Sequence, residues 1–114
     1  MPRLSQHAFF RVAKALADTQ RGRILERIAA APELCCSDLV SCFPVSQATV
    51  SHHLKELVAA ELVDRRKDGQ FAYFRFRADI MNAYFDELRR RLRMGAASAA
   101  APGAERPAAA GARA

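Results

Sequence analysis

Three observations predict that this sequence forms a mainly α-helical domain with a small β-hairpin. Residues 5–59 hold four segments whose apolar residues recur at helical spacing. Residues 62–77 alternate apolar and polar side chains around Asp68-Gly69, which is a strong short-range signal of a hairpin. A fifth helical stripe of apolar residues runs from residue 79 to about residue 94. The predicted order is therefore α-α-α-α-β-β-α.

The first two helices follow from their apolar spacing and from the residues at their ends. Residues 5–18 form the first helix, with the hydroxyl of Ser5 as its N-terminal cap. The second runs from about residue 19 to residue 31, and Pro32 ends it. Their inner faces consist of Phe9, Val12, Ala13, Leu16 and Ala17 in the first helix and Ile24, Leu25 and Ile28 in the second.

The next two segments predict a helix-turn-helix, because a tight turn joins two short helices. Residues 37–42 form the first helix, residues 43–45 the turn, and residues 46–57 the second helix, with Ser46 as its N-cap. At about 100° per residue, the second helix has one apolar stripe and one face of small and polar side chains. Such a helix can dock on a domain and present hydrogen-bonding groups to the major groove of DNA. The apolar stripe is Val50, Leu54, Leu57 and Val58, and the outer face is Ala48, Thr49, His52, Lys55, Glu56 and Ala59.

The hairpin that follows is predicted to be a wing, so the fold class is a winged helix-turn-helix. Asp68-Gly69 suits a type I′ turn, which needs positive φ at both central residues. In the second strand, alternation places Ala72, Phe74 and Phe76 on one face and Phe71, Tyr73, Arg75 and Arg77 on the other.

The last helix is predicted to form a subunit interface. Asp79 caps it, and four arginines near its C-terminus suit the helix dipole. Its apolar stripe is large for a small domain that already has a core, so we expect a dimer through the first and last helices. The alternative is that the stripe completes the core of one chain. The stripe consists of Ile80, Met81, Tyr84, Phe85, Leu88 and Leu92, and the arginines are Arg89, Arg90, Arg91 and Arg93.

The composition fits one small domain with an acidic partner. The chain has 114 residues and a formal net charge of +6, which favours nucleic acid over membrane. We expect residues 1–94 to form the domain and residues 95–114, rich in Ala, Gly and Pro, to be a disordered tail. No apolar run approaches the roughly 20 residues of a bilayer span, and Gln6, His7 and Arg11 interrupt any signal-peptide core. The sequence therefore predicts a cytoplasmic protein.

Four motifs in order resemble those of the ArsR/SmtB family of dimeric winged-helix repressors. They are Lys14-Ala15-Leu16-Ala17-Asp18 followed by Arg21 and Arg23-Ile24-Leu25, then Glu33-Leu34-Cys35 followed by Asp38-Leu39, then Ser46-Gln47-Ala48-Thr49-Val50-Ser51-His52-His53-Leu54, and finally Leu62-Val63 with the Asp68-Gly69 hairpin. The resemblance covers about residues 8–92. Two positions depart from it: Thr19-Gln20 stands where family members usually carry Pro-Thr, and Gly22 stands where Leu is usual. Both departures should alter the rigidity of a helix junction and leave the DNA surface unchanged.

The resemblance implies a sequence-specific repressor that binds double-stranded DNA at an imperfect palindrome as a homodimer. Two-fold symmetry then spaces the half-sites about one helical turn, or a multiple, apart. Gln47 can bond bidentately to adenine, and Thr49 and Ser51 can reach base edges or phosphates. His52 points outward to DNA, while His53, at the core margin, orients the helix or touches a phosphate. Lys55 suits a phosphate, and the wing residues Arg65, Arg66 and Lys67 suit phosphates or the minor groove.

The resemblance also directs attention to the thiols, because family members are commonly released from DNA by a metal, a metalloid or an oxidant. Cys35 matches the first position of the family's Cys-x-Cys pair, but Ser37 occupies the second. The ligand site on the family's last helix is absent, since no histidine follows His53. We therefore expect no resident metal or cofactor and no zinc or nickel sensing on that helix.

Three interpretations of Cys35, Cys36 and Cys42 remain open. In the first, Cys35 and Cys36 form a redox switch, because a helix N-terminus lowers the pKa of a thiol. A disulfide between neighbours is strained, since adjacent Cα atoms lie about 3.8 Å apart, and a strained disulfide is easily reduced. In the second, the three thiols bind As(III), which requires a loop or the other subunit to close a gap of about 10 Å along a helix. In the third, Cys42 is a buried apolar residue and the pair has no role.

Other functional classes fit less well. The sequence has cysteines and histidines, but no Cys-x-x-Cys motif, no glycine-rich phosphate loop and little room for a substrate cleft, so we expect no enzyme. A winged-helix module that binds only protein is the remaining alternative, and undetectable salt-dependent DNA binding would identify it.

Overall fold

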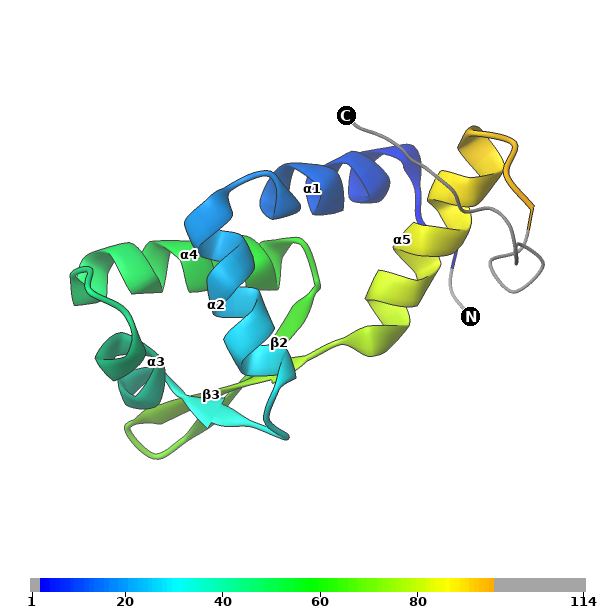
Figure 1. Cartoon of the computed structure of the whole chain (residues 1–114). Helices are drawn as coiled ribbons and strands as arrows, with labels where there is room; N and C mark the ends of the chain where they lie inside the picture. The colour runs from blue at the N-terminus through cyan, green and yellow to red at the C-terminus, as the bar shows by residue number, and fades with distance from the viewer. Residues whose placement is uncertain (1–2, 96–114) are drawn as a thin grey trace. The chain divides into compact units, whose positions relative to one another are not determined.

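The computed structural model describes residues 3–95 and contains five helices and a three-stranded sheet (Figure 1). The chain divides into two compact units, residues 1–84 and residues 85–114, and each is described by itself. Within residues 3–95, no helix is long and apolar enough to cross a membrane. The predicted tail falls outside the described residues except for Gly95. The elements are α1 (Gln6–Leu16), α2 (Thr19–Ala29), β1 (Leu34–Cys35), α3 (Cys36–Cys42), α4 (Gln47–Ala59), β2 (Val63–Asp68), β3 (Phe71–Phe76) and α5 (Ala78–Arg91).

Three helices begin at a side chain that accepts a hydrogen bond from the first turn. The hydroxyl of Ser5 accepts a hydrogen bond from the backbone N–H of Ala8 at 3.1 Å, and the hydroxyl of Ser46 accepts one from the backbone N–H of Thr49 at 3.1 Å. Both caps were predicted and are confirmed. Asp18 caps α2 in the same way, with its carboxylate 2.9 Å from the N–H of Arg21, and this bond lowers the pKa of Asp18.

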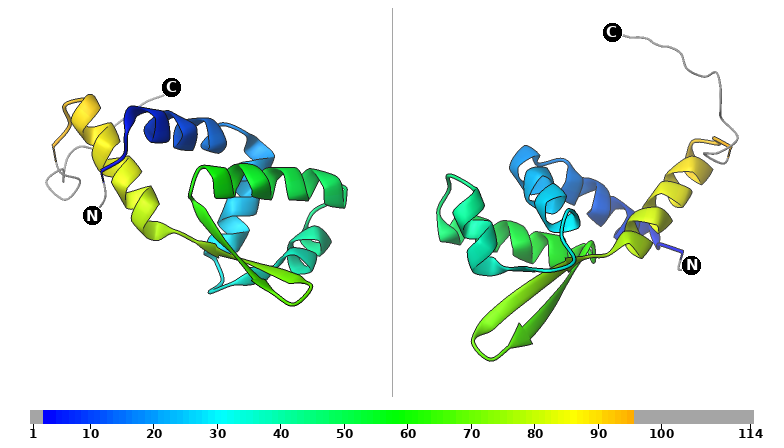
Figure 2. Two further views of the ribbon diagram at one scale, coloured as in Figure 1. Left: turned by 180° about the vertical axis from the view of Figure 1, so that it is seen from behind. Right: turned by 60° about the horizontal axis from the view of Figure 1, so that its bottom comes forward.

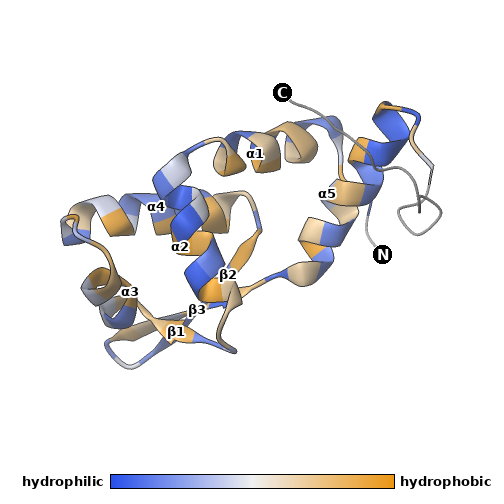
Figure 3. Cartoon of the chain, viewed as in Figure 1, coloured by the Kyte–Doolittle hydropathy of each residue, from blue (hydrophilic) through white to orange (hydrophobic). Residues whose placement is uncertain are grey.

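A single hydrophobic core joins the helices of the first unit to its sheet. Apolar and hydrophilic residues share the helices (Figure 3). The predicted inner face of α2 is buried, but in α1 only Phe9 and Val12 of the predicted residues are; Ala17 is exposed, and the buried Ala15 was not predicted. The second helix of the helix-turn-helix contributes Val50, Leu54 and Leu57 to this core, as predicted. Ile80 and Ala83 of α5 are also buried, so this part of the last helix completes the unit's core. The side chains with the least exposure are Val12, Ile24, Ile28, Leu39, Val50, Leu57, Leu62 and Val63.

The sheet contains a strand that the sequence did not predict. Its order is β1-β3-β2, and both pairings are antiparallel. The short strand β1 pairs Leu34 with Phe74 and Cys35 with Tyr73. The β2–β3 hairpin extends away from the helices (Figure 2), and β1 links the start of α3 to the middle of β3.

The hairpin turn differs from the predicted type I′ turn. Asp68 pairs with Phe71, so the two loop residues are Gly69 and Gln70. Gly69 has φ of 63°, whereas Gln70 is not among the described residues with positive φ. Positive φ at the first central residue alone matches a type II′ turn, in which glycine takes that position. The prediction of the hairpin is confirmed, and the prediction of its turn type is wrong.

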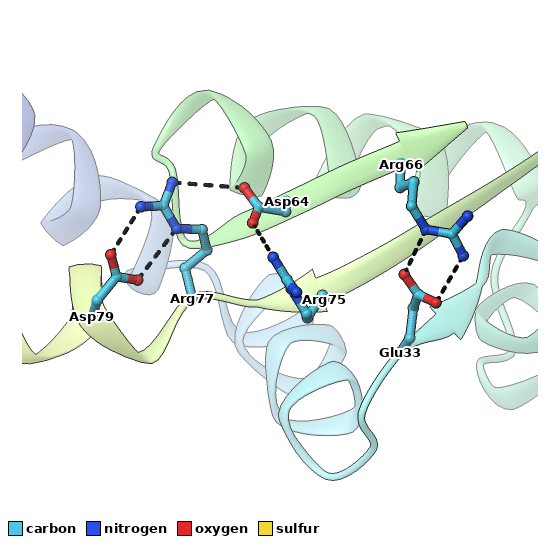
Figure 4. Close-up of polar contacts among 6 residues, drawn as sticks. All are labelled: Glu33, Asp64, Arg66, Arg75, Arg77 and Asp79. Atoms are coloured by element: carbon cyan, nitrogen blue, oxygen red, sulfur yellow. Dashed lines mark hydrogen bonds and ion pairs between the residues drawn. The ribbon is translucent and has the colours of Figure 1, made fainter. Parts of the chain in front are cut away.

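The predicted cap of the last helix is also corrected. The helix begins at Ala78, so Asp79 lies inside the first turn. Its carboxylate accepts two hydrogen bonds from Arg77, at 3.2 and 2.9 Å, and these lower the pKa of Asp79. Arg77 also lies 3.6 Å from Asp64 of β2 (Figure 4). One arginine therefore fastens the base of the wing to the start of α5.

In the second unit, the end of α5 is held by ion pairs one turn apart. Glu87 accepts from Arg90 at 2.8 Å and from Arg91 at 2.9 Å, while Arg89 lies 3.4 Å from Asp86. Leu92 and Met94 beyond these pairs are 61% and 59% exposed. The unit thus presents apolar side chains beside a basic cluster.

Replacing Gly22 with alanine should stabilise the protein. Gly22 lies within α2, where glycine costs about 0.5–1 kcal/mol relative to alanine. A Cβ at this position would have no atom within 4 Å, so nothing opposes the gain. We expect Gly22→Ala to raise the free energy of unfolding by up to about 1 kcal/mol, measured by urea denaturation. A decrease would show that the flexible junction matters to the folded state.

Candidate nucleic-acid interface and thiol site

Helix α4 presents the predicted polar residues on its exposed side. Gln47, Ser51, His52 and Lys55 are exposed; by helical angle His52 and Lys55 lie opposite the buried apolar stripe, and Gln47 and Ser51 lie at its margin. Thr49 is half-buried, and its hydroxyl lies 3.0 Å from that of Ser46. The arrangement gives a helix whose N-terminal turn and outer side can reach a groove of DNA.

His53 is buried, which removes it from the residues that can touch DNA directly. Its side chain is 7% exposed, and it interacts electrostatically with Asp18 and Arg21 of α2. Within the described residues, neither its Nδ1 nor Nε of Arg21 has a hydrogen-bond partner. Burial lowers the pKa of His53, and the Asp18 carboxylate partly opposes this. The predicted phosphate contact is thus corrected, while the alternative role, orienting α4 on the domain, fits this position.

The wing has two chemically different faces. Alternation along β2 places Arg65 and Lys67 on the face of their partners Phe74 and Ala72. Arg65 lines a cleft together with Ser51 and Lys55 of α4. Of the three predicted wing cations, Arg65 and by alternation Lys67 therefore lie on the side of α4.

Arg66 lies on the opposite face and is already paired. Its guanidinium donates to both carboxylate oxygens of Glu33, at 3.1 and 2.9 Å (Figure 4). It also lies 4.7 Å from the centre of the Tyr73 ring, a cation–π distance. These contacts hold Arg66, in the outer half of the hairpin, against the segment before β1.

The two adjacent thiols occupy different environments at the start of α3. The N–H of Cys35 donates to Asp38 at 3.3 Å, and its sulfur accepts from the hydroxyl of Ser37 at 3.4 Å. Burial raises the pKa of the Cys36 thiol, with Cys35 adding to the effect and Arg65 opposing it. The expectation that the helix N-terminus lowers a thiol pKa is therefore wrong for Cys36, because desolvation dominates there.

The structure also corrects the interpretation of Cys42 and leaves a chelating site unassembled. Cys42 is exposed, so it is not the buried apolar residue that one interpretation assumed. Within residues 3–95, no group of three or more Cys, His, Asp or Glu side chains could hold a metal ion. A shared ion at all three thiols would need a different arrangement of this segment.

A cleft of about 330 Å³ brings the thiol pair next to the DNA-facing elements. Cys35 and Cys36 line it together with Gln47, the first residue of α4. Gln70 and Phe71 at the tip of the wing complete its rim. Both thiols therefore lie in one cleft with the first residue of α4 and with the tip of the hairpin.

Comparison with known proteins identifies the family. A family model described as a helix-turn-helix domain matches residues 16–66. The chain is 39% identical over 77 residues to the arsenical resistance operon repressor of Staphylococcus aureus, an alignment that covers 68% of this chain and 73% of that repressor. The chain belongs to the ArsR family. It is a DNA-binding transcriptional repressor with a winged helix-turn-helix fold.

Solved structures of ArsR-family proteins agree with this fold. An ArsR-like transcriptional regulator from Rhodococcus sp. RHA1 has a TM-score of 0.70 and 29% identity, over 76% of this chain and 81% of that chain. A homodimeric winged helix-turn-helix DNA-binding domain from Mycobacterium bovis has a TM-score of 0.61 and 25% identity, over 82% of this chain and 90% of that chain. The ArsR family is a family of transcription regulators and not of enzymes.

The sequence did not reveal the residues that contact His53 and Arg66. Asp18 and Arg21 lie in the family's N-terminal motif but face His53, and Glu33 and Tyr73 hold Arg66. Glu33 and Arg66 are 33 positions apart, so no local spacing could pair them. The motif around Asp18 was visible, but its contact with the recognition helix was not.

The buried His53 should make the stability of the protein depend on pH. Its pKa is lowered from 6.5 in the folded state, so the unfolded chain binds a proton more readily. The contribution of neutral His53 is complete above pH 6.5 and is lost as the pH falls through the lowered pKa. We expect urea denaturation to show this loss as the pH falls below 6.5 and to show a shallower dependence of stability on pH in His53→Gln. His52→Gln is the matched control, and an equal change of slope in both variants would contradict the assignment.

Arg66→Ala should affect the wing more than it affects DNA affinity. Because Arg66 is paired with Glu33 and stacked on Tyr73, its loss removes a contact between the hairpin and the segment before β1. We expect a small drop in Tm, matched by Glu33→Gln, and a smaller change in the salt dependence of DNA binding than Arg65→Ala produces. Thermal denaturation and DNA titrations at several salt concentrations measure both. If Arg66→Ala changes the salt dependence of DNA binding as much as Arg65→Ala does, Arg66 contacts DNA and the structural assignment is wrong.

Proposed function

We propose that this repressor binds an imperfect palindromic operator as a homodimer and that oxidation of Cys35 and Cys36 releases it. The cleft that joins both thiols to Gln47 and the wing tip carries this proposal. Oxidation there alters the packing of the same elements that must fit DNA. Its site of action is the cytoplasm, where the operator lies.

The DNA contacts in this proposal come from α4 and one face of the wing. Gln47, Ser51 and His52 read base edges from the exposed side of α4, and Thr49 reaches DNA from the same turn. Lys55, Arg65 and Lys67 neutralise phosphates or enter the minor groove. A free cation on an exposed surface suits a phosphate better than one with a carboxylate partner. Arg65 meets this condition, and the paired Arg66 does not.

The homodimer is supported by a structural neighbour and by the second unit. The Mycobacterium bovis domain is homodimeric, and Leu92 and Met94 of this chain are more than half exposed. Burial of such residues in a partner subunit would stabilise a small domain. Two-fold symmetry then places two copies of α4 in successive major grooves.

The redox chemistry balances with peroxide as the oxidant. One thiolate attacks peroxide to give a sulfenic acid and water, and the second thiol displaces water to form the disulfide. Two thiols thus lose two electrons, and one peroxide yields two waters. Two observations favour Cys35 as the attacking thiol. Its sulfur accepts a hydrogen bond from the hydroxyl of Ser37, and burial raises the pKa of Cys36, which keeps that thiol protonated.

A thiol-based response to As(III) is the alternative effector. The Staphylococcus aureus relative is named for arsenical resistance, and adjacent thiols suit a thiophilic ion. Two thiols of one chain supply only part of a three-thiol site, so Cys42 or a thiol of the second subunit must join them. Release by arsenite without an oxidant therefore separates this alternative from the redox proposal, and its dependence on Cys42 shows whether Cys42 is the third ligand.

One set of DNA-binding measurements tests the proposal. DNA upstream of the gene is titrated with reduced protein, with peroxide-treated protein and with arsenite, using the wild type and Cys35→Ser, Cys36→Ser and Cys42→Ser. We expect peroxide to weaken binding reversibly in the wild type and in Cys42→Ser, but in neither of the other variants. Release by arsenite without an oxidant supports the alternative. Unchanged affinity throughout eliminates both effectors, and undetectable salt-dependent DNA binding supports a protein-binding module.

A further inference from the structure

A second cleft lies between α4 and the wing, next to the thiol cleft. It has a volume of about 370 Å³, which falls within the range of small-molecule sites, about 300–1,000 Å³. The two clefts share Cys36 and Ala72. Gln47 and the wing tip belong only to the thiol cleft, whereas Lys55 and Arg65 belong only to this one. We call it the α4–wing cleft.

The lining of the α4–wing cleft combines an apolar wall with positive charge. The half-buried Val58 and Ala72 supply accessible apolar surface, while the nearly buried Leu54 and Phe74 lie beneath it, and Lys55 and Arg65 are the charged residues among the described lining. Among the residues that the structure describes, no carboxylate lines the cleft. Within residues 3–95, neither cation has an ion-pair partner, in contrast to Arg66, Arg75 and Arg77 nearby.

This lining distinguishes two occupants. A DNA phosphate can satisfy the two cations, but it has no apolar part to cover Val58 and Ala72. A small organic anion can do both, because its acidic group pairs with the cations and its apolar body displaces water from the wall. Cys36 adds to the wall as a protonated, uncharged thiol, since burial raises its pKa.

We infer that the α4–wing cleft is a binding site for a small amphipathic organic anion, an aromatic or short-chain carboxylate or sulfonate. The bound acid occupies Lys55 and Arg65, and it therefore competes with DNA for them. This competition rests on the proposed phosphate contacts of the two residues, whereas the binding of the acid does not. The repressor thus has a binding site for an amphipathic organic anion beside its thiol pair.

Binding is tested with 8-anilinonaphthalene-1-sulfonate, an amphipathic anion that fluoresces when it leaves water. We expect saturable binding to the wild type and binding at least about tenfold weaker in the double variant Lys55→Gln/Arg65→Gln, because charge-assisted hydrogen bonds are lost. Lys14→Gln on α1 is the matched control and should bind like the wild type. N-phenyl-1-naphthylamine lacks the sulfonate, so its binding should not change in the double variant. Equal binding of the sulfonate to the wild type and the double variant overturns the inference.

Thiol labelling locates the bound anion independently of the variants. Iodoacetamide is neutral, and mass spectrometry reports alkylation at each cysteine separately. We expect the bound sulfonate to slow alkylation of Cys36, which lines the cleft, and to leave Cys35 and Cys42 unaffected. Protection of Cys35 or Cys42 instead, or no protection of Cys36, places the anion elsewhere and overturns the inference even when the variants fold poorly.

A DNA titration then separates this site from the proposed function. If the sulfonate binds as described and the apparent Kd for operator DNA rises as its occupancy rises, both the binding site and the competition with DNA are supported. If it binds at Cys36 without affecting DNA affinity, the site stands and the competition is refuted. If the wild type binds no DNA, the proposed function fails, while the fluorescence and labelling results still decide the binding site.

Discussion

Leu57→Ala should cost the protein about 2–5 kcal/mol of its free energy of unfolding. Leu57 has 0% exposure and belongs to the apolar stripe with which α4 packs into the core. Its truncation leaves a cavity beneath the helix that is proposed to enter DNA. Small domains are stable by only about 5–15 kcal/mol, so the loss is a large share of the total. Urea denaturation with a fixed m-value measures it.

The neighbouring residue provides the control. Val58 is half-buried on the same turn of α4, so Val58→Ala removes less buried surface and should cost clearly less than Leu57→Ala. DNA affinity of the folded fraction should change little in either variant, because neither side chain belongs to the outer face. A Leu57→Ala cost below about 1 kcal/mol would show that α4 can collapse onto the core, and the helix would then be loosely docked.

The helices could be predicted because their signals are local. Ser5 and Ser46 lie next to the apolar stripes that they cap, and both accept the expected bond. Pro32 bounds the second helix, which ends at Ala29 instead of residue 31. Spacing at 3–4 residues within α4 identified its inner face without knowledge of its partners. A short segment is enough to predict a helix when the capping hydrogen bond and the helical spacing of apolar residues both lie within it.

Features that depend on distant segments could not be predicted. Strand β1 has two residues, too few to show a period, and it exists because Leu34 and Cys35 pair with β3. The turn type depended on which residues pair across the hairpin, and the pairing of Asp68 with Phe71 moved the loop by one residue. Local sequence gives the presence of a hairpin more readily than its register.

The candidate site shows the same division between local and distant information. The outward direction of His52 follows from helical angle and was predicted. The surroundings of His53 depend on Asp18 and Arg21 of another segment, and the pairing of Arg66 depends on Glu33. The thiol pKa was inferred from helix position alone, whereas the surroundings of Cys36 reverse its direction. Charge and burial supplied by other segments decide which polar residues remain available to a ligand.

Gln47→Ala and Arg65→Ala should separate the reading of bases from the attraction to phosphates. A bidentate contact to adenine discriminates against the wrong base by about 1–3 kcal/mol. Gln47→Ala should therefore weaken operator binding by roughly tenfold or more and leave binding to random DNA nearly unchanged. Arg65→Ala should weaken both, because a phosphate contact carries no sequence information.

Salt dependence supplies the second readout for this pair. Each phosphate contact contributes a slope of about −0.9 in log K against log salt, so Arg65→Ala should make the slope shallower by about that amount and Gln47→Ala should leave it unchanged. The comparison uses Arg65 because Arg66 is paired with Glu33 on the other face of the wing. Fluorescence titrations on operator and random duplexes at several salt concentrations measure both quantities. Equal loss on the two duplexes for both variants would mean that α4 and the wing do not divide these roles.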